Sequence, residues 1–137
     1  MSASILIIDD SKFQVKQHKI FFEEVLELDV VALGFNGQEA VSLYKKHLPD
    51  FICLDITMPK QNGEEAIKKI LHFDPNAKII VISAIQGDRV MEIMEHGVKL
   101  FYRKPLKMTD PSFIQQIQLD IQKLKSSSWL KNLRIHS

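Results

Sequence analysis

The sequence predicts an α/β fold in which a parallel sheet carries helices on both faces. Short apolar runs alternate with longer segments of helical period, and the runs themselves are almost free of polar residues. Nearly continuous apolar runs are typical of strands that are covered on both faces, as in parallel sheets. Strands joined by helices imply right-handed crossovers and a doubly wound arrangement.

Five β–α units are expected along the chain. The expected strands cover residues 5–8, 30–33, 51–54, 79–82 and 98–103, and the expected helices cover 12–28, 36–48, 64–71, 88–95 and a last helix from 110 onward. In the first helix the apolar residues at helical spacing are Phe13, Ile20, Phe21, Val25 and Leu28. In the last helix the expected buried stripe consists of Ile114, Ile117, Ile121 and Leu124.

Capping residues mark several helix boundaries. Asn36, with a glutamate three residues later, is typical of a capping box, and Pro49 ends that helix. Gly97 follows the fourth helix at a position that favours the left-handed conformation. Asp110 before Pro111 is typical of a helix start.

The overall composition indicates an ordinary globular domain. The chain has 137 residues, of which 45% are hydrophobic and 26% charged, and its net charge is +1. This charge gives no support for a nucleic-acid or membrane binder, and no apolar run approaches the roughly 20 residues that span a bilayer. With no secretory signal in view, we expect a cytoplasmic protein. The single cysteine, Cys53, is expected to be a small buried side chain, and the five histidines are expected at the surface.

Polar side chains stand at the ends of four of the expected strands. Asp9 and Asp10 follow the first strand, Asp55 follows the third, Ser83 the fourth and Lys104 the fifth. Because the carboxyl ends of parallel strands meet at one edge of a sheet, these side chains are expected to lie close together.

This grouping suits a hard cation and a phosphoryl group. Three neighbouring carboxylates need a counter-charge, and an oxygen-only ligand set favours Mg²⁺ or Mn²⁺. Asp55 could act as a nucleophile toward phosphorus, Lys104 could balance the transferred charge and Ser83 could donate a hydrogen bond. Taken singly, Asp9 or Asp10 could instead cap the following helix, and Lys104 could be a solvated lysine.

Four motifs resemble the receiver domain of two-component response regulators, the CheY-like family. They are Ile7–Ser11, Leu54–Pro59 with Gly63 following, Ile82–Ala84, and Lys104–Leu106. The resemblance covers residues 3–125 and implies a flavodoxin-like, five-stranded sheet of order 2-1-3-4-5. The remaining residues, 126–137, are expected to form a short basic tail.

The resemblance also implies roles for the site residues. Asp55 would accept a phosphoryl group from a histidine kinase, a phosphotransfer protein or acetyl phosphate. The implied Mg²⁺ ligands are Asp10, Asp55, the backbone carbonyl of Thr57 and, mostly through a water molecule, Asp9. Ser83 and Lys104 would contact phosphoryl oxygens, and the Lys104–Pro105 peptide bond would be cis.

A switch is implied as well. Ser83 would move toward the phosphoryl group and Phe101 would swing inward behind it, while the neighbouring Tyr102 points the other way. The partner surface would comprise the helix at 88–95, the strand at 98–103 and the last helix. Thr57 and Ile85 would set the lifetime of the phosphoryl group, and the apolar Ile85 predicts slow self-dephosphorylation.

Three functions follow from these patterns. The first is a stand-alone response regulator that catalyses its own phosphorylation and dephosphorylation without being a conventional enzyme, and that signals to a protein target, with a weak dimer possible. The second is a magnesium-dependent phosphatase of the haloacid-dehalogenase type, although the order of its acidic residues differs. The third is a pseudo-receiver that only binds proteins. The tail, with Trp129, Leu130 and Leu133, is either a docked or frayed extension or a partner-binding element.

Overall fold

The computed structural model describes residues 2–56 and 61–136, and it describes side chains for these residues except 61–62 and 127–136. The chain divides into two compact units, Met1–Leu106 and Lys107–Ser137. The first unit contains the sheet and four of the helices, and the second contains the last helix.

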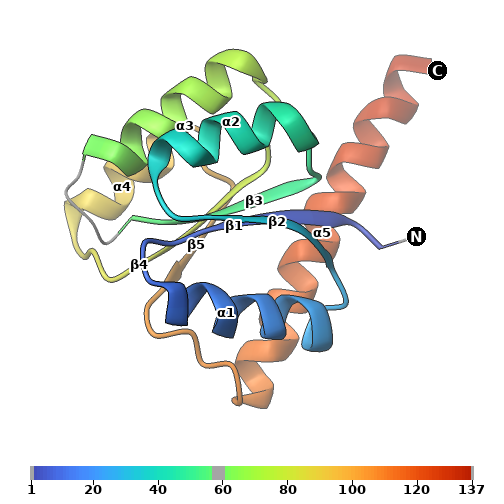
Figure 1. Ribbon diagram of the computed structural model, residues 1–137. Helices are drawn as coiled ribbons and strands as arrows, with labels where there is room; N and C mark the ends of the chain where they lie inside the picture. The colour runs from blue at the N-terminus through green and yellow to red at the C-terminus, as the bar shows by residue number, and fades with distance from the viewer. Residues whose placement is uncertain (1, 57–60, 137) are drawn as a thin grey trace. The chain divides into compact units, whose positions relative to one another are not determined.

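Within the described part of the first unit, five parallel strands form one sheet in the order β2-β1-β3-β4-β5 (Figure 1). The strands are β1 (Ser4–Ile8), β2 (Asp29–Gly34), β3 (Phe51–Asp55), β4 (Ile79–Ser83) and β5 (Leu100–Arg103). The α/β class, the doubly wound parallel sheet and the strand order predicted from the sequence are therefore confirmed.

Helices cover both faces of this sheet. Within the first unit they are α1 (Lys12–Ile20) with a π-helical turn η1 (Phe21–Val25), α2 (Gly37–His47), α3 (Gln61–Phe73) and α4 (Asp88–Glu95). Figure 1 shows α1 on one face and α2 and α3 on the other. The three central strands are almost completely buried between them, as their continuous apolar runs predict.

The first helix differs from the prediction. Its α-helical part ends at Ile20 and the π-helical turn ends at Val25, and Glu27 then adopts a left-handed backbone with φ of 57°. Phe13 and Ile20, two of the apolar residues at helical spacing from which this helix was predicted, are 68% and 54% exposed. The buried positions of α1 are instead Val15 and His18. The wider π-helical turn then shifts the phase of the helix, and the adjacent Phe21 and Phe22 are both buried.

The caps largely follow the sequence signals. The Glu39 amide donates a 2.8 Å hydrogen bond to the side chain of Asn36, and the Glu39 carboxylate accepts a 2.7 Å bond from the Phe35 amide. α1 is capped by Ser11, whose hydroxyl accepts from the Gln14 amide, and not by Asp9 or Asp10. The capping alternative for these two aspartates is therefore wrong, and they are available for another role.

The second unit contains α5 (Pro111–His136). Asp110 accepts a 3.0 Å hydrogen bond from the Ser112 amide at its start, as its capping role predicts. The helix continues without a break through residues 126–128, so the backbone does not mark the predicted boundary after residue 125. The side chains of Trp129, Leu130 and Leu133 lie outside the described residues. Among the described helices, none is both long and apolar enough to cross a bilayer.

Candidate functional site

The parallel register brings the polar strand ends to one edge of the sheet. Ile8 pairs with Leu54, which places the following Asp9 level with Asp55 at the end of β3. The Lys104 amide donates a 3.0 Å hydrogen bond to the carbonyl of Ser83, which joins the ends of β4 and β5. Residues separated by up to 95 positions in sequence are thereby assembled at one place.

The assembled residues form an acidic cluster of Asp9, Asp10 and Asp55 with Lys104 against them. One carboxylate oxygen from each aspartate lies within 4.8 Å of the others. The Lys104 ammonium donates a hydrogen bond to the Asp55 carboxylate and lies 3.3 Å from Asp9 Oδ2. The side chains of Asp9 and Asp55 are 1% and 2% exposed, whereas Asp10 is exposed. The cluster thus combines two buried carboxylates, Asp9 and Asp55, with one that faces solvent, Asp10.

Burial and mutual repulsion alter the protonation of this cluster. Burial, and then the charge of Asp55, raise the pKa of Asp9 from 3.8 to about 6, against the opposing effects of a 2.9 Å hydrogen bond from the Ser11 amide and the charge of Lys104. For Lys104, burial lowers the pKa, but the hydrogen bond to Asp55 and the charges of both aspartates outweigh burial and raise it above its ordinary value.

The donor set fits a hard divalent cation. Among the described residues of the cluster, three carboxylates face one ammonium, so the charge is incompletely balanced. All the candidate ligands are oxygens, the donors that Mg²⁺ and Mn²⁺ prefer. Burial and the charge of Asp55 raise the pKa of Asp9, and a bound cation would oppose both effects by favouring the ionised carboxylate. Thr57, the further ligand expected from the sequence, lies outside the described residues.

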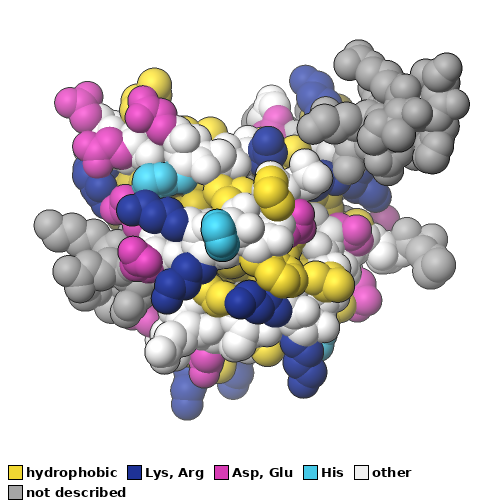
Figure 2. All heavy atoms as spheres, turned by 90° about the horizontal axis from the view of Figure 1, so that it is seen from above, with side chains coloured by type: hydrophobic (Ala, Val, Ile, Leu, Met, Phe, Trp, Pro, Cys, Tyr) yellow, Lys and Arg dark blue, Asp and Glu magenta, His cyan; other side chains and the backbone are white. Residues whose placement is uncertain are grey.

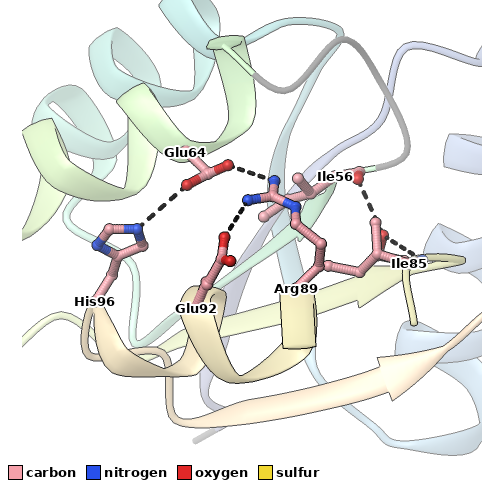
Figure 3. A network of polar contacts seen from close by, with 7 residues as sticks. Ile56, Glu64, Ile85, Arg89, Glu92 and His96 are labelled. Atoms are coloured by element: carbon pink, nitrogen blue, oxygen red, sulfur yellow. Dashed lines mark hydrogen bonds and ion pairs between the residues drawn. The ribbon is translucent and has the colours of Figure 1, made fainter. Parts of the chain in front are cut away.

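Ser83 is buried beside the cluster and is held by two hydrogen bonds. Its hydroxyl donates to the Ile56 carbonyl at 3.0 Å and accepts from the Ile85 amide at 3.2 Å (Figure 3). Because Ile56 directly follows Asp55, this contact links the end of β4 to the end of β3. Phe101 and Ile85 are partly buried against the core, and the Lys104–Pro105 peptide bond is cis, as expected.

Two features of the surroundings are missed by the sequence analysis. The first is an ion network that joins α3 to α4 (Figure 3): Glu64 accepts from Arg89 at 2.5 Å and lies 3.3 Å from His96, and Arg89 also donates to Glu92 at 2.7 Å. The spacing of Arg89 and Glu92 is a usable signal for one pair. The link to Glu64, 25 residues away, has no comparable signal.

The second feature is a buried histidine. His18 was expected at the surface, but it is 2% exposed on the inner side of α1. Burial, and then the positive charge of Lys104, lower the pKa of His18 from 6.5 to about 4, against the opposing charge of Asp55. Cys53, by contrast, is buried as predicted, and burial raises the pKa of its thiol, which therefore stays protonated.

Comparisons with known proteins agree with this geometry. A family model described as the response regulator receiver domain matches residues 5–115. Among curated relatives, the chemotaxis protein CheY of Thermotoga maritima is 40% identical over 111 residues, which covers 78% of this chain and 89% of the relative. CheY of Bacillus subtilis is 38% identical over 111 residues, with the same coverage.

Solved structures give the same result. A chain of the CheX–CheY–BeF3–Mg²⁺ complex from Borrelia burgdorferi is 34% identical and superimposes with a TM-score of 0.77, covering 89% of this chain and 88% of that chain. A CheY-like receiver domain protein from Methanospirillum hungatei also superimposes with a TM-score of 0.77. Because it is only 18% identical, this similarity supports the fold alone.

Proposed function

This chain belongs to the response regulator receiver domain family and acts in two-component signalling, and we propose that Asp55 is the residue that accepts the phosphoryl group. The observation that carries the proposal is the contact of the Lys104 ammonium with both Asp55 and Asp9 at the carboxyl edge of the sheet. Family membership disfavours a haloacid-dehalogenase-type phosphatase. The presence of Asp10, Asp55 and Lys104 together disfavours a pseudo-receiver.

In the proposed reaction, a carboxylate oxygen of Asp55 attacks the phosphorus atom of the donor. The donor is a phosphohistidine of a histidine kinase or phosphotransfer protein, or a small acyl phosphate. An oxygen–phosphorus bond forms, and the bond from phosphorus to the donor breaks, with its electron pair leaving on the donor. Lys104 is already placed to neutralise charge on the transferred group, and the Ser83 hydroxyl exchanges the Ile56 carbonyl for a phosphoryl oxygen.

Asp9, Asp10 and Asp55, with the backbone carbonyl of Thr57, would hold Mg²⁺ in this proposal. When bound, the ion supplies charge neutralisation for the aspartates and the phosphoryl oxygens. The unbalanced charge of the described cluster and the raised pKa of Asp9 support this assignment. The residues that line the cluster would therefore orient the acceptor and balance charge, which is the main protein contribution to phosphoryl transfer.

We further propose that phosphorylation is transmitted to a protein target through α4 and β5, together with the last helix. Phe101 lies in β5 and packs against the same core as Met94 of α4, so an inward movement of its ring is one way to couple the cluster to α4. The Borrelia burgdorferi neighbour is seen in a complex with CheX, and several relatives are chemotaxis proteins. By analogy, we propose that this chain acts in a cytoplasmic chemotaxis pathway and that a CheX-like protein is among its partners.

The test is incubation of the purified chain with acetyl phosphate and Mg²⁺, followed by intact mass measurement of the wild type and Asp55→Asn. We expect a phosphate adduct on the wild type that is absent from the variant. The adduct should also fail to form when the metal is chelated before acetyl phosphate is added. Because Asn keeps the shape of the side chain, loss of the adduct is attributable to the missing carboxylate. An adduct that persists in Asp55→Asn would move the acceptor to another residue.

A further inference from the structure

A groove runs between α2 and α3 and shares no residue with the acidic cluster. It consists of two adjoining hollows of about 450 and 470 Å³. Both hollows are lined by Val41 and Lys45 of α2 and by Lys69 of α3, so they form one continuous depression. We call it the α2–α3 groove.

Each helix contributes one stripe of side chains to the groove. The α2 stripe runs from Gln38 through Val41 to Lys45, and the α3 stripe runs from Glu65 through Lys69 to Phe73. These spacings of three, four and seven or eight residues place the side chains on a single face of each helix. At 1.5 Å per residue the stripes are about 10–12 Å long, which matches about two turns of a bound helix.

The lining of the groove combines apolar and basic side chains. Val41, Ala66 and Phe73 are apolar lining residues, and Phe73 is 46% exposed although it is a large aromatic residue. Lys45 and Lys69 are basic lining residues, and the Lys45 ammonium lies 5.3 Å from the Phe73 ring centroid. Figure 2 shows apolar side chains on this face of the molecule with Lys and Arg side chains around them.

The charges of the groove are strongly biased toward one sign. Lys45, Lys68 and Lys69 line it, whereas Glu65 is the one carboxylate among its described lining residues. All three lysines are exposed. An occupant that carries carboxylates at the edges of an apolar face would therefore be complementary in both charge and polarity.

We propose that the α2–α3 groove binds a short amphipathic helix of a partner protein, with apolar side chains over Val41 and Phe73 and carboxylates beside Lys45, Lys68 and Lys69. This is the helix-in-groove mode of recognition, in which anchors repeat every three or four residues. The site is separate from the phosphorylation site and from α4 and β5, so it holds a partner independently of the proposed function.

The tail of this chain is an unsuitable occupant because it is basic, like the groove. Residues 122–137 contain Lys123, Lys125, Lys131 and Arg134 and no acidic residue, so the tail would be repelled by the groove. A second copy is the stronger rival, because Asp88, Met91, Glu92 and Glu95 are exposed at helical spacing on α4. The experiment must separate these occupants.

The test is an amide chemical-shift titration of the ¹⁵N-labelled full chain with a synthetic helical peptide of about four turns. One face of the peptide carries Leu and the other positions carry Glu. We expect shift changes concentrated in α2 and α3. The variant Lys45→Glu/Lys69→Glu should bind about ten-fold more weakly. Lys16→Glu/Lys46→Glu, with the same change in net charge on exposed lysines outside the groove, should bind like the wild type.

Several results would overturn the proposal. One is equal binding of a peptide in which Lys replaces Glu, since the apolar face alone would then explain binding. Others are shift changes centred on the exposed Phe13 and Ile20 of α1, or tighter binding of a single-stranded oligonucleotide of equal charge. Sedimentation velocity of the chain alone tests the second copy: self-association that Glu92→Lys/Glu95→Lys abolishes would replace the partner helix with α4.

Discussion

The acidic cluster and the ion network of Glu64, Arg89, Glu92 and His96 use similar side chains in different surroundings. In each, one cation joins carboxylates from different elements: Lys104 joins Asp9 and Asp55, and Arg89 joins Glu64 and Glu92. The lysine side chain is 16% exposed and its two partners almost fully buried. The Arg89 and Glu92 side chains are 36% and 56% exposed.

Burial explains why only one of these groups suits chemistry. Water and salt screen the charges of an exposed network, so each pair contributes little and the network mainly restrains the helices that carry it. Desolvated charges interact strongly and need compensation. Burial raises the pKa of Asp9, which supports the proposal that this cluster holds a cation and a phosphoryl group. The degree of burial, more than the number of ion pairs, therefore separates the proposed phosphorylation site from the exposed ion network.

Removing the cation from each group tests directly whether burial makes the two groups different. Lys104→Ala leaves three carboxylates without their ammonium, and loss of one partner from a buried pair typically costs about 3–5 kcal/mol of unfolding free energy. Arg89→Ala should cost several-fold less. Urea denaturation at neutral pH without divalent ions measures both, and added Mg²⁺ should recover part of the loss in Lys104→Ala.

The matched control is Lys16→Ala, which removes an exposed lysine from α1 and should leave stability unchanged. If Arg89→Ala destabilised the protein as much as Lys104→Ala, burial would not be the property that separates the two groups. If Mg²⁺ stabilised neither the wild type nor Lys104→Ala, the acidic cluster would not be a metal site.

The positions of the site residues could be predicted from the sequence better than the burial of the first helix. Asp9, Asp55, Ser83 and Lys104 were predictable because each ends a strand, and parallel pairing alone brings strand ends together. The exposure of Phe13 was not predictable from the sequence. The apolar spacing of the first helix does not reveal the π-helical turn that changes the phase of this helix.

Contacts between helices are the other part that the sequence could not supply. The Glu64–Arg89 pair depends on how α3 and α4 lie against each other, and side-chain spacing within a helix carries no information about a neighbouring helix. The roles of Thr57, Ile85 and Phe101 and the boundary after residue 125 stay predictions.

A second prediction extends the comparison to histidine. The neutral form of His18 is favoured in the folded chain because its pKa is lowered to about 4, while the unfolded chain titrates near 6.5. The resulting stability is present above pH 6.5 and is lost as the pH falls toward 4, since the unfolded state then binds more protons. The lowering corresponds to about 3 kcal/mol.

The measurement is the difference in unfolding free energy between the wild type and His18→Gln as a function of pH. Subtracting the two curves cancels the contribution of Asp9, whose raised pKa acts in the opposite direction. The difference should shrink as the pH falls from 6.5 to 4. A difference that is constant over this range would show that His18 is not held in the neutral form.

A third prediction concerns water near the acidic cluster. Ile85 is partly buried, and its backbone amide donates to Ser83, the residue proposed to contact the phosphoryl group. We expect slow self-dephosphorylation, and Ile85→Asn or Ile85→Glu should shorten the lifetime of the phosphoryl group by roughly ten-fold, about 1.4 kcal/mol in the barrier. Loss of the adduct with time in Mg²⁺ buffer measures this lifetime. Ile85→Leu is the control, and a wild-type half-life of only seconds would contradict the prediction.

The smallest effect on global stability is expected at the exposed network, where a local measurement is needed. Arg89 holds α4 to Glu64 of α3 and also pairs with Glu92 within α4, so Arg89→Ala should loosen one helix without unfolding the domain. Amide hydrogen exchange should therefore speed up in residues 88–95 and stay unchanged in the buried strands β1, β3 and β4. Glu92→Ala, which leaves the link to Glu64 intact, should have a weaker effect on the same amides. Faster exchange throughout the sheet would mean that the network supports the whole fold, and no change in α4 would mean that packing of Ile93 alone holds the helix in place.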